Sequence, residues 1–132
     1  MIKIWMLSAI VILLSGCQIA APLFVNYNGV RRDVATWINN HQFLSMQQKR
    51  SLVQLSKAQQ KLKRFPEYDS NLQFEVAKEN QIALICARQQ VSEKKIKQLQ
   101  DLVFVDNTAQ ILFNYEQLAP KIKLDTHQIQ CE

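Results

Sequence analysis

The stretch Ile82-Ala83-Leu84-Ile85-Cys86-Ala87 is a run of six residues without a charged or strongly polar side chain. Coiled into a helix, this run is apolar around the whole circumference, which is typical of a helix that other elements enclose. Polar residues flank it on both sides within the segment 70–90. We therefore predict that 70–90 forms the central and most buried helix of the fold.

Further helices are predicted on both sides of this segment. Apolar residues recur there at steps of three and four, the spacing of one face of a helix. Val34 and Ile38 belong to such a face in the first segment, and Leu52, Leu55 and Leu62 form one in the second, interrupted by a polar glutamine. The four segments with this pattern are 27–40, 46–64, 92–105 and 107–118.

Several of the predicted helices begin with a capping-box pattern, Ser-x-x-Gln or Asn-x-x-Gln. In this pattern the first side chain accepts a hydrogen bond from the third backbone amide, and the glutamine reaches back to the cap amide. Ser92 is a simpler cap for the fourth segment, and prolines follow the second and fifth. The three capping boxes are predicted at Ser45–Gln48, Ser70–Gln73 and Asn107–Gln110.

The composition agrees with an all-α fold. The chain of 132 residues contains two glycines, Gly16 and Gly29, so Gly-rich phosphate loops and tightly turned β-sandwiches are poor candidates. The short β-like run Val103-Phe104-Val105 has no apparent partner strand and is interpreted as a helix end. The predicted fold is an all-α bundle of four to five helices in residues 27–132.

The first seventeen residues follow a different pattern. Lys3 precedes an apolar run over 4–14, which is shorter than the roughly 20 residues that a membrane-spanning helix needs. Leu14-Ser15-Gly16-Cys17 comes directly after it. The order and spacing resemble the signal peptide and lipobox of bacterial lipoproteins. An ordinary signal peptide, or a short anchor helix with a chance cysteine, is the alternative.

The lipobox resemblance implies a covalent lipid anchor. Residues 1–16 would be removed as a signal peptide, and Cys17 would carry acyl chains on its sulfur and on the new amine. Several chains anchor a protein stably where one is marginal. Residues 17–26 would then form a short lipidated tether. Gln18 stands where an aspartate usually retains such proteins in the inner membrane, so the resemblance implies the outer membrane of a Gram-negative cell.

Two cysteines remain once Cys17 is assigned to lipid. Cys86 and Cys131 are an even pair, and in an oxidising compartment such a pair is expected to form a structural disulfide. The bond would close a loop of about 45 residues, worth roughly 4 kcal/mol in the chain-entropy model. It would also hold the polar tail 125–132 onto the central helix. Free thiols with a disordered tail, or a redox pair, are the alternatives.

The basic residues are concentrated in one predicted helix. The chain has a formal net charge of +5, and without Lys3 the mature part would carry +4. Residues 49–64 contain six basic residues and no acid. We call the four that share a helix face the basic row, and its members are Arg50, Lys57, Lys61 and Arg64. The row is either a solvated face or a contact surface for anionic envelope components or an acidic envelope protein. Nucleic acid is not expected as a partner at the outer envelope.

No motif for catalysis or metal binding is recognised. His41 and His127 lie outside any metal-ligand spacing, and His127 with Cys131 supplies two ligands where a tetrahedral site needs four. Glu75 and Glu79 have the i,i+4 spacing of a carboxylate pair, which on a helix is more often a solvated face. We expect no cofactor, no metal site and no enzymatic activity.

Two further resemblances concern the first half of the mature chain. Tyr27-Asn28, Trp37-Ile38 and the step Phe43–Gln48 resemble the start of a family of uncharacterised proteobacterial lipoproteins, over residues 17–65. Leu44-Ser45-Met46-Gln47-Gln48 is also similar to the Leu-Thr-x-x-Gln motif of small periplasmic helical chaperones, with Ser45 in place of the usual threonine. The second resemblance implies a thin, often dimeric helical cradle with a basic concave face.

The function expected from these observations is an envelope interaction or accessory protein, anchored to the outer membrane through Cys17. A membrane-tethered chaperone or envelope-stress protein is the alternative.

Overall fold

The apolar stretch around Cys86 lies within helix α3 (Ser70–Gln90), as the sequence predicts. The computed structural model describes residues 29–132, and this part of the chain is all-helical. The other four α-helices are α1 (Arg32–Asn39), α2 (Met46–Leu62), α4 (Glu93–Phe104) and α5 (Thr108–Leu118). Short 3-10 turns connect or follow them: η2 (Phe65–Glu67), η3 (Val105–Asn107), η4 (Ala119–Lys121) and η5 (Thr126–Gln128). The predicted fold class is confirmed.

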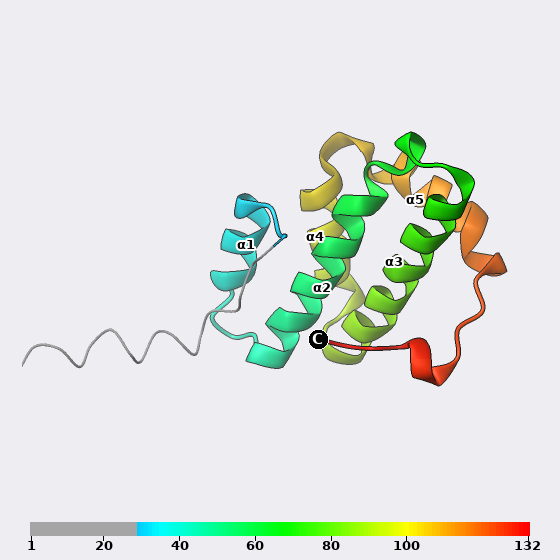
Figure 1. Cartoon of the computed structure of the whole chain (residues 1–132). Helices are drawn as coiled ribbons and strands as arrows, with labels where there is room; N and C mark the ends of the chain where they lie inside the picture. The colour runs from blue at the N-terminus through cyan, green and yellow to red at the C-terminus, as the bar shows by residue number, and fades with distance from the viewer. Residues whose placement is uncertain (1–28) are drawn as a thin grey trace, which may run out of the picture.

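Helices α2 and α3 form the antiparallel pair on which the other helices pack (Figure 1). The Gln48 side chain donates to the Gln90 carbonyl at one end of the pair, and Gln73 donates to the Phe65 carbonyl at the other. Helix α1 contacts α2 and α4, and α5 contacts α3 and α4. One continuous apolar core runs between these helices.

The prediction that 70–90 is the most buried helix is wrong, because α2 buries more of its residues. Nine of the 17 residues of α2 are buried, against seven of the 21 residues of α3. Helix α2 has neighbours on three sides, so even Ser56 and Gln59 are fully enclosed. In α3, Ala83, Leu84 and Cys86 are buried, while the two isoleucines of the stretch are half-buried.

The capping predictions hold for two helices and are wrong for two. Ser45 and Gln48 form the complete capping box of α2, and the Ser92 side chain caps α4. Helix α3 is instead capped by Asp69, whose carboxylate accepts from the Leu72 amide. Asn107 precedes α5 but its side chain makes no capping bond. Aspartate and serine are both favoured caps, so the sequence pattern did not separate Asp69 from Ser70, and the charged carboxylate is the stronger acceptor.

Helix α1 is shorter than the predicted 27–40. It begins at Arg32 and ends at Asn39, and Val34 and Ile38 of the predicted face are buried. Val30 precedes the helix and is half-buried against the core. Residues 27 and 28, the segments 1–16 and 17–26, and Cys17 lie outside the described residues.

Val105 joins α4 to α5 in an unfavourable backbone conformation. Its φ is 58° and its ψ is −116°, and its side chain is 55% exposed. A positive φ is strained for a β-branched residue because the side chain crowds the main chain. The helix end predicted at Val103-Phe104-Val105 is confirmed, and the backbone is strained where α4 passes into η3.

Replacing Val105 by glycine should stabilise the fold. Glycine adopts positive φ freely, so Val105→Gly removes the strain and loses little buried surface. We expect the free energy of unfolding to rise by about 1 kcal/mol in urea titrations, after the greater freedom of glycine in the unfolded chain is included. Val91→Gly, at an extended and half-buried residue, is the control and should destabilise. A loss of stability in Val105→Gly would contradict the strain.

Candidate functional site

The two remaining cysteines form a disulfide between helix α3 and the end of the chain. Cys86 and Cys131 are bonded, with their Cα atoms 5.6 Å apart and a sequence separation of 45. Cys86 is buried in α3, whereas Cys131 lies at the surface. The predicted pairing is confirmed, and it fastens the C-terminal residues 125–132, here called the strap, onto the bundle.

The strap crosses α3 and ends beside α2 (Figure 1). The Gln54 side chain donates to the Gln130 carbonyl at 2.8 Å and accepts from the Glu132 amide at 3.1 Å. Gln47 donates to the Glu132 carbonyl oxygen at 3.3 Å. The strap is therefore held by hydrogen bonds to α2 as well as by the disulfide to α3.

Three of the four members of the basic row form ion pairs within the molecule. Lys57 Nζ lies 3.5 Å from a Glu132 carboxylate oxygen, which adds an ion pair to the strap. Lys61 contacts both carboxylate oxygens of Glu79 on α3, at 2.8 and 3.0 Å. Arg64 bonds Glu67 in the next turn at 2.6 Å, and this contact raises the pKa of the Arg64 guanidinium.

Arg50 is the member of the row that stays exposed without an ion pair among the described residues. It lies near the start of α2, whereas Lys57 and Lys61 lie in its second half and Arg64 follows the end of the helix at Leu62. The members of the basic row thus do not all share one helix, and most of their charge is balanced by acids of the same chain. The sequence pattern located the cations but did not show their partners, of which Glu79 and Glu132 come from distant segments.

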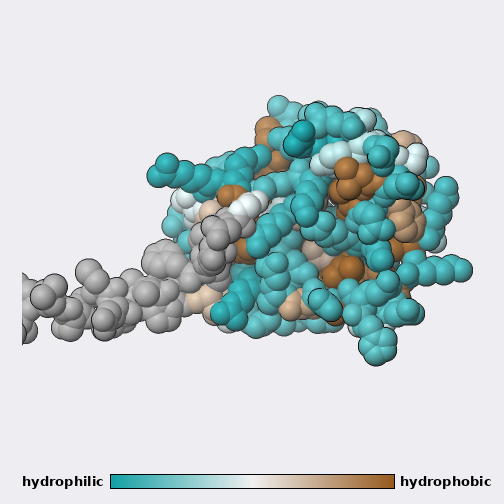
Figure 2. Space-filling view, viewed as in Figure 1, coloured by the Kyte–Doolittle hydropathy of each residue, from teal (hydrophilic) through white to brown (hydrophobic). Residues whose placement is uncertain are grey.

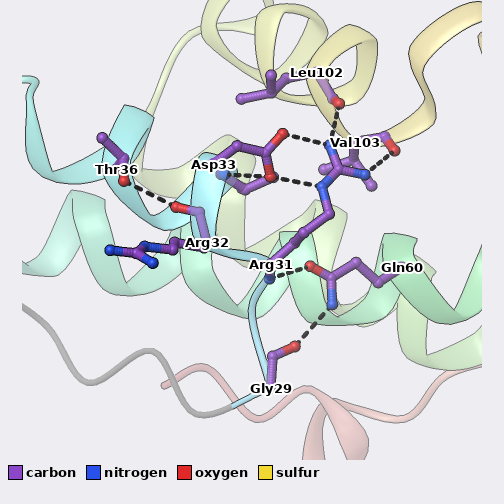
Figure 3. A network of polar contacts seen from close by, with 9 residues as sticks. Gly29, Arg31, Arg32, Asp33, Thr36, Gln60, Leu102 and Val103 are labelled. Carbon is purple, nitrogen blue, oxygen red and sulfur yellow. Dashed lines mark hydrogen bonds and ion pairs between the residues drawn. The ribbon is translucent and has the colours of Figure 1, made fainter.

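The start of the described chain is tied to α2 and α4 by a network that we call the N-terminal clamp (Figure 3). The Gln60 amide donates to the Gly29 carbonyl and accepts from the Arg31 amide, both at 2.8 Å. The Arg31 guanidinium donates to the carbonyls of Leu102 and Val103, at 2.7 and 3.2 Å. A cation at these carbonyls is favourable, because they belong to the negative C-terminal end of α4.

Asp33 completes the clamp by accepting two bonds from the Arg31 guanidinium, at 2.6 and 2.9 Å. The Arg31 hydrogen bond is the main cause of a lowered pKa of the Asp33 carboxyl, and the Val34 amide adds to it. The same contact raises the pKa of Arg31. The clamp was not predicted from the sequence, because Arg31 and Gln60 match no motif and their partners are mostly backbone atoms.

Gly29 is the point where the described chain enters the bundle. Its φ of +87° lies in the left-handed region that glycine adopts without strain. A Cβ at this position would meet the Lys57 side chain only at 4.0 Å, so the backbone angle and not the space favours glycine here.

An open groove of about 880 Å³ lies beside the clamp, between Gly29 and the end of α2. Three cations line it, of which Arg31 and Arg64 are bonded to acids. Lys63 is the lining cation that makes no ion pair within residues 29–132. Val30 and Pro66 supply an apolar part of the wall.

A layer of two fully buried polar side chains, Gln59 and Asn80, interrupts the otherwise apolar contact between α2 and α3. The hydrogen bonds Gln48–Gln90, Lys61–Glu79 and Gln73–Phe65 define the register of α2 against α3, and this register places Gln59 and Asn80 at the same level along the two helices. Their amide atoms make no hydrogen bond of good geometry with described residues. Burial raises the pKa of the nearby Tyr115 phenol, and the Asn80 amide partly opposes this rise.

The histidines and the carboxylate pair occupy structural or solvated positions. A His41 ring nitrogen is hydrogen-bonded to the Trp37 carbonyl at 2.6 Å, and His127 is exposed in η5. Glu79 is bonded to Lys61, while Glu75 is exposed. Within residues 29–132 no cluster of three or more potential metal ligands is found.

None of the helices within residues 29–132 is both long enough and apolar enough to cross a bilayer. A scan against models of protein families, a search of curated proteins and a search of solved structures each find no match to this chain.

Breaking the disulfide should cost a large part of the stability. Removal of a link that closes 45 residues is expected to lower the free energy of unfolding by about 4 kcal/mol. We expect this loss for Cys131→Ser in a Cys17→Ser background, measured by urea denaturation without reductant. Cys17→Ser alone is the control and should match the parent chain. A loss below about 1 kcal/mol would contradict a stabilising role of the bond.

The Arg31–Asp33 pair should make stability depend on acid pH. The pKa of Asp33 is lower in the folded chain than in the unfolded chain, so its contribution is complete at neutral pH and is lost as pH falls through the folded value. Both side chains are at least 35% exposed, so Asp33→Asn should cost less than about 1 kcal/mol near pH 7. The cost, measured against the parent in urea, should shrink toward pH 3 (about one unit below an ordinary carboxyl pKa). If Asp33→Asn lowers the free energy of unfolding by the same amount at every pH, the loss does not come from the Arg31–Asp33 pair.

Proposed function

We propose that this chain is a lipid-anchored, non-catalytic accessory protein of the bacterial envelope, whose helical domain is held near the outer membrane by Cys17. The observation that carries the proposal is the sequence Leu14-Ser15-Gly16-Cys17 after a short apolar run with a single basic residue. A cysteine thiolate is the nucleophile that a thioether-linked lipid requires.

The disulfide supports an extracytoplasmic location. Bonds of this kind form and persist in oxidising compartments such as the periplasm. The Cys86–Cys131 bond fixes the strap, which a reducing cytosol would release. Gln18 in place of aspartate favours the outer over the inner membrane within the same proposal.

The accessory function is preferred to a chaperone cradle because of the way the basic row is used. A cradle for unfolded clients relies on an available basic face, whereas Lys57, Lys61 and Arg64 are bonded to acids of the chain. Cross-linking mass spectrometry on intact envelopes separates the two. One recurrent envelope partner supports the accessory function, and many unrelated unfolded chains support the cradle.

The anchor itself is tested by the mass of the purified protein. We expect protein from the envelope of a Gram-negative host to begin at Cys17 and to carry acyl chains on that residue. Cys17→Ser should abolish the acyl mass and release the protein from the membrane, whereas Cys131→Ser should leave acylation unchanged. A mature protein with an unmodified Cys17 would overturn the proposal.

A further inference from the structure

One end of the bundle combines a fully exposed aromatic side chain with an excess of positive charge. The turn between α1 and α2, the start of α2, the end of α3 and the start of α4 meet there. Leu44, Gln48, Arg88 and Lys95 line one hollow of about 410 Å³ at this end. We call this region the basic pole and define it by Phe43, Leu44, Arg50, Arg88, Lys94 and Lys95.

Phe43 projects from the tip of the turn. The Leu44 amide donates to the His41 carbonyl at 3.2 Å, so Phe43 occupies a central position of a tight turn. Its side chain is 101% exposed, whereas the other large exposed apolar side chains of the described chain are 45–56% exposed. Elsewhere the visible surface is mostly hydrophilic, with hydrophobic residues in separate patches (Figure 2).

A second aromatic lies next to the turn and already contacts a cation. The Trp37 ring packs edge-on against His41 with 4.4 Å between ring centroids, and Lys95 Nζ lies 5.6 Å from the Trp37 centroid. Trp37 is half-buried, so part of its ring remains accessible. Aromatic rings beside cations are the composition that membrane–water interfaces favour.

Three cations of the basic pole, Arg50, Lys94 and Lys95, oppose the electrostatic preference of their own helices, whereas Arg88 lies in the last turn of α3, where a cation is favourable. Helices α2 and α4 both begin at this end, and the positive ends of helix dipoles favour acids. Helix α2 has no acid in its first turn and carries Arg50 one turn in, while α4 carries Lys94 and Lys95 in its first turn. The acids near this end are Glu93, bonded to Arg88, and Glu132, whose side chain is paired with Lys57. The helix dipoles therefore do not account for Arg50, Lys94 and Lys95.

We propose that the basic pole is the surface with which the domain contacts the anionic face of the membrane, with Phe43 entering the headgroup region. This inference rests on the proposed lipid anchor. The positive charge is complementary to anionic headgroups, and a surface aromatic gains an apolar environment there.

The geometry allows this contact. The chain between Cys17 and Gly29 spans at most roughly 40 Å when extended. Helix α2, with 17 residues, is only about 25 Å long, so every end of the bundle is within reach of the anchored bilayer. The tether therefore keeps the domain at high local concentration near the membrane but does not determine which face contacts the bilayer. The basic pole determines this orientation.

The test uses the lipidated mature protein, purified from envelopes and reconstituted in vesicles that contain lipids brominated on their acyl chains. The sequence has two tryptophans, Trp5 and Trp37, and removal of residues 1–16 leaves Trp37 as the only reporter. We expect bromine to quench Trp37 in vesicles with anionic headgroups and much less in neutral vesicles or at high salt. Phe43→Ser, or Arg50→Glu with Lys94→Glu, should reduce the quenched fraction by about half or more.

Matched controls come from the same chain. Phe113→Ser removes an exposed phenylalanine of α5, and Lys121→Glu with Lys123→Glu reverses two exposed cations near η4. Both variants should leave quenching unchanged. Vesicle-bound protein with unquenched Trp37, or equal loss in the controls, would overturn the basic pole while the anchor stands. Protein that does not sediment with vesicles at all would overturn the anchor.

Discussion

The structure depends on helix α2 being surrounded. Leu52, Leu55 and Leu62 are fully buried against α1, α3 and α4, and this burial is the main source of favourable free energy for so small a bundle. The residues of α2 that are not in the core also have structural partners. Gln54 holds the end of the chain and Gln60 holds its described beginning. A change in the position of α2 would therefore displace both ends at once.

These contacts of α2 change how its positive charge is interpreted. A helix with six basic residues and no acid was expected to present a positive face to a partner or to solvent. Lys57 and Lys61 instead meet acids that arrive from the strap and from α3. Among the cations without an ion pair in residues 29–132, Arg50, Lys94 and Lys95 lie near the starts of α2 and α4, at the basic pole, and Lys63 lies just past the end of α2. Part of the charge predicted for this helix thus fastens the fold.

The sequence alone predicted the features that depend on local periodicity. It also predicted the disulfide, because only two cysteines remained to pair once Cys17 was assigned to lipid. The five helices, the caps at Ser45 and Ser92 and the Cys86–Cys131 bond were all predicted. It was insufficient where a partner comes from a distant segment. The Arg31 clamp depends on carbonyls some 70 residues away, and no residue type marks a carbonyl as available.

Local competition limited the prediction in two other places. Asp69 and Ser70 are both good helix caps, and the structure selects the one with the stronger acceptor. Gln59 is buried opposite Asn80 because several helices surround α2. The number of neighbouring helices cannot be read from the periodicity of one helix. Of the candidate site, the cysteine pair and the basic row were predicted from the sequence, whereas the N-terminal clamp and the partners of the basic row were not, because these contacts are tertiary.

Helix α2 is the centre of stability, and native-state hydrogen exchange of the full chain tests this most directly. Amide exchange measured residue by residue should be slowest in the buried second half of α2 and in α3 around Cys86. The Arg31 amide, bonded to Gln60, should exchange more slowly than the amides of the exposed turn at Phe43. An α2 that exchanges as fast as that turn, while α4 or α5 remains protected, would contradict the account.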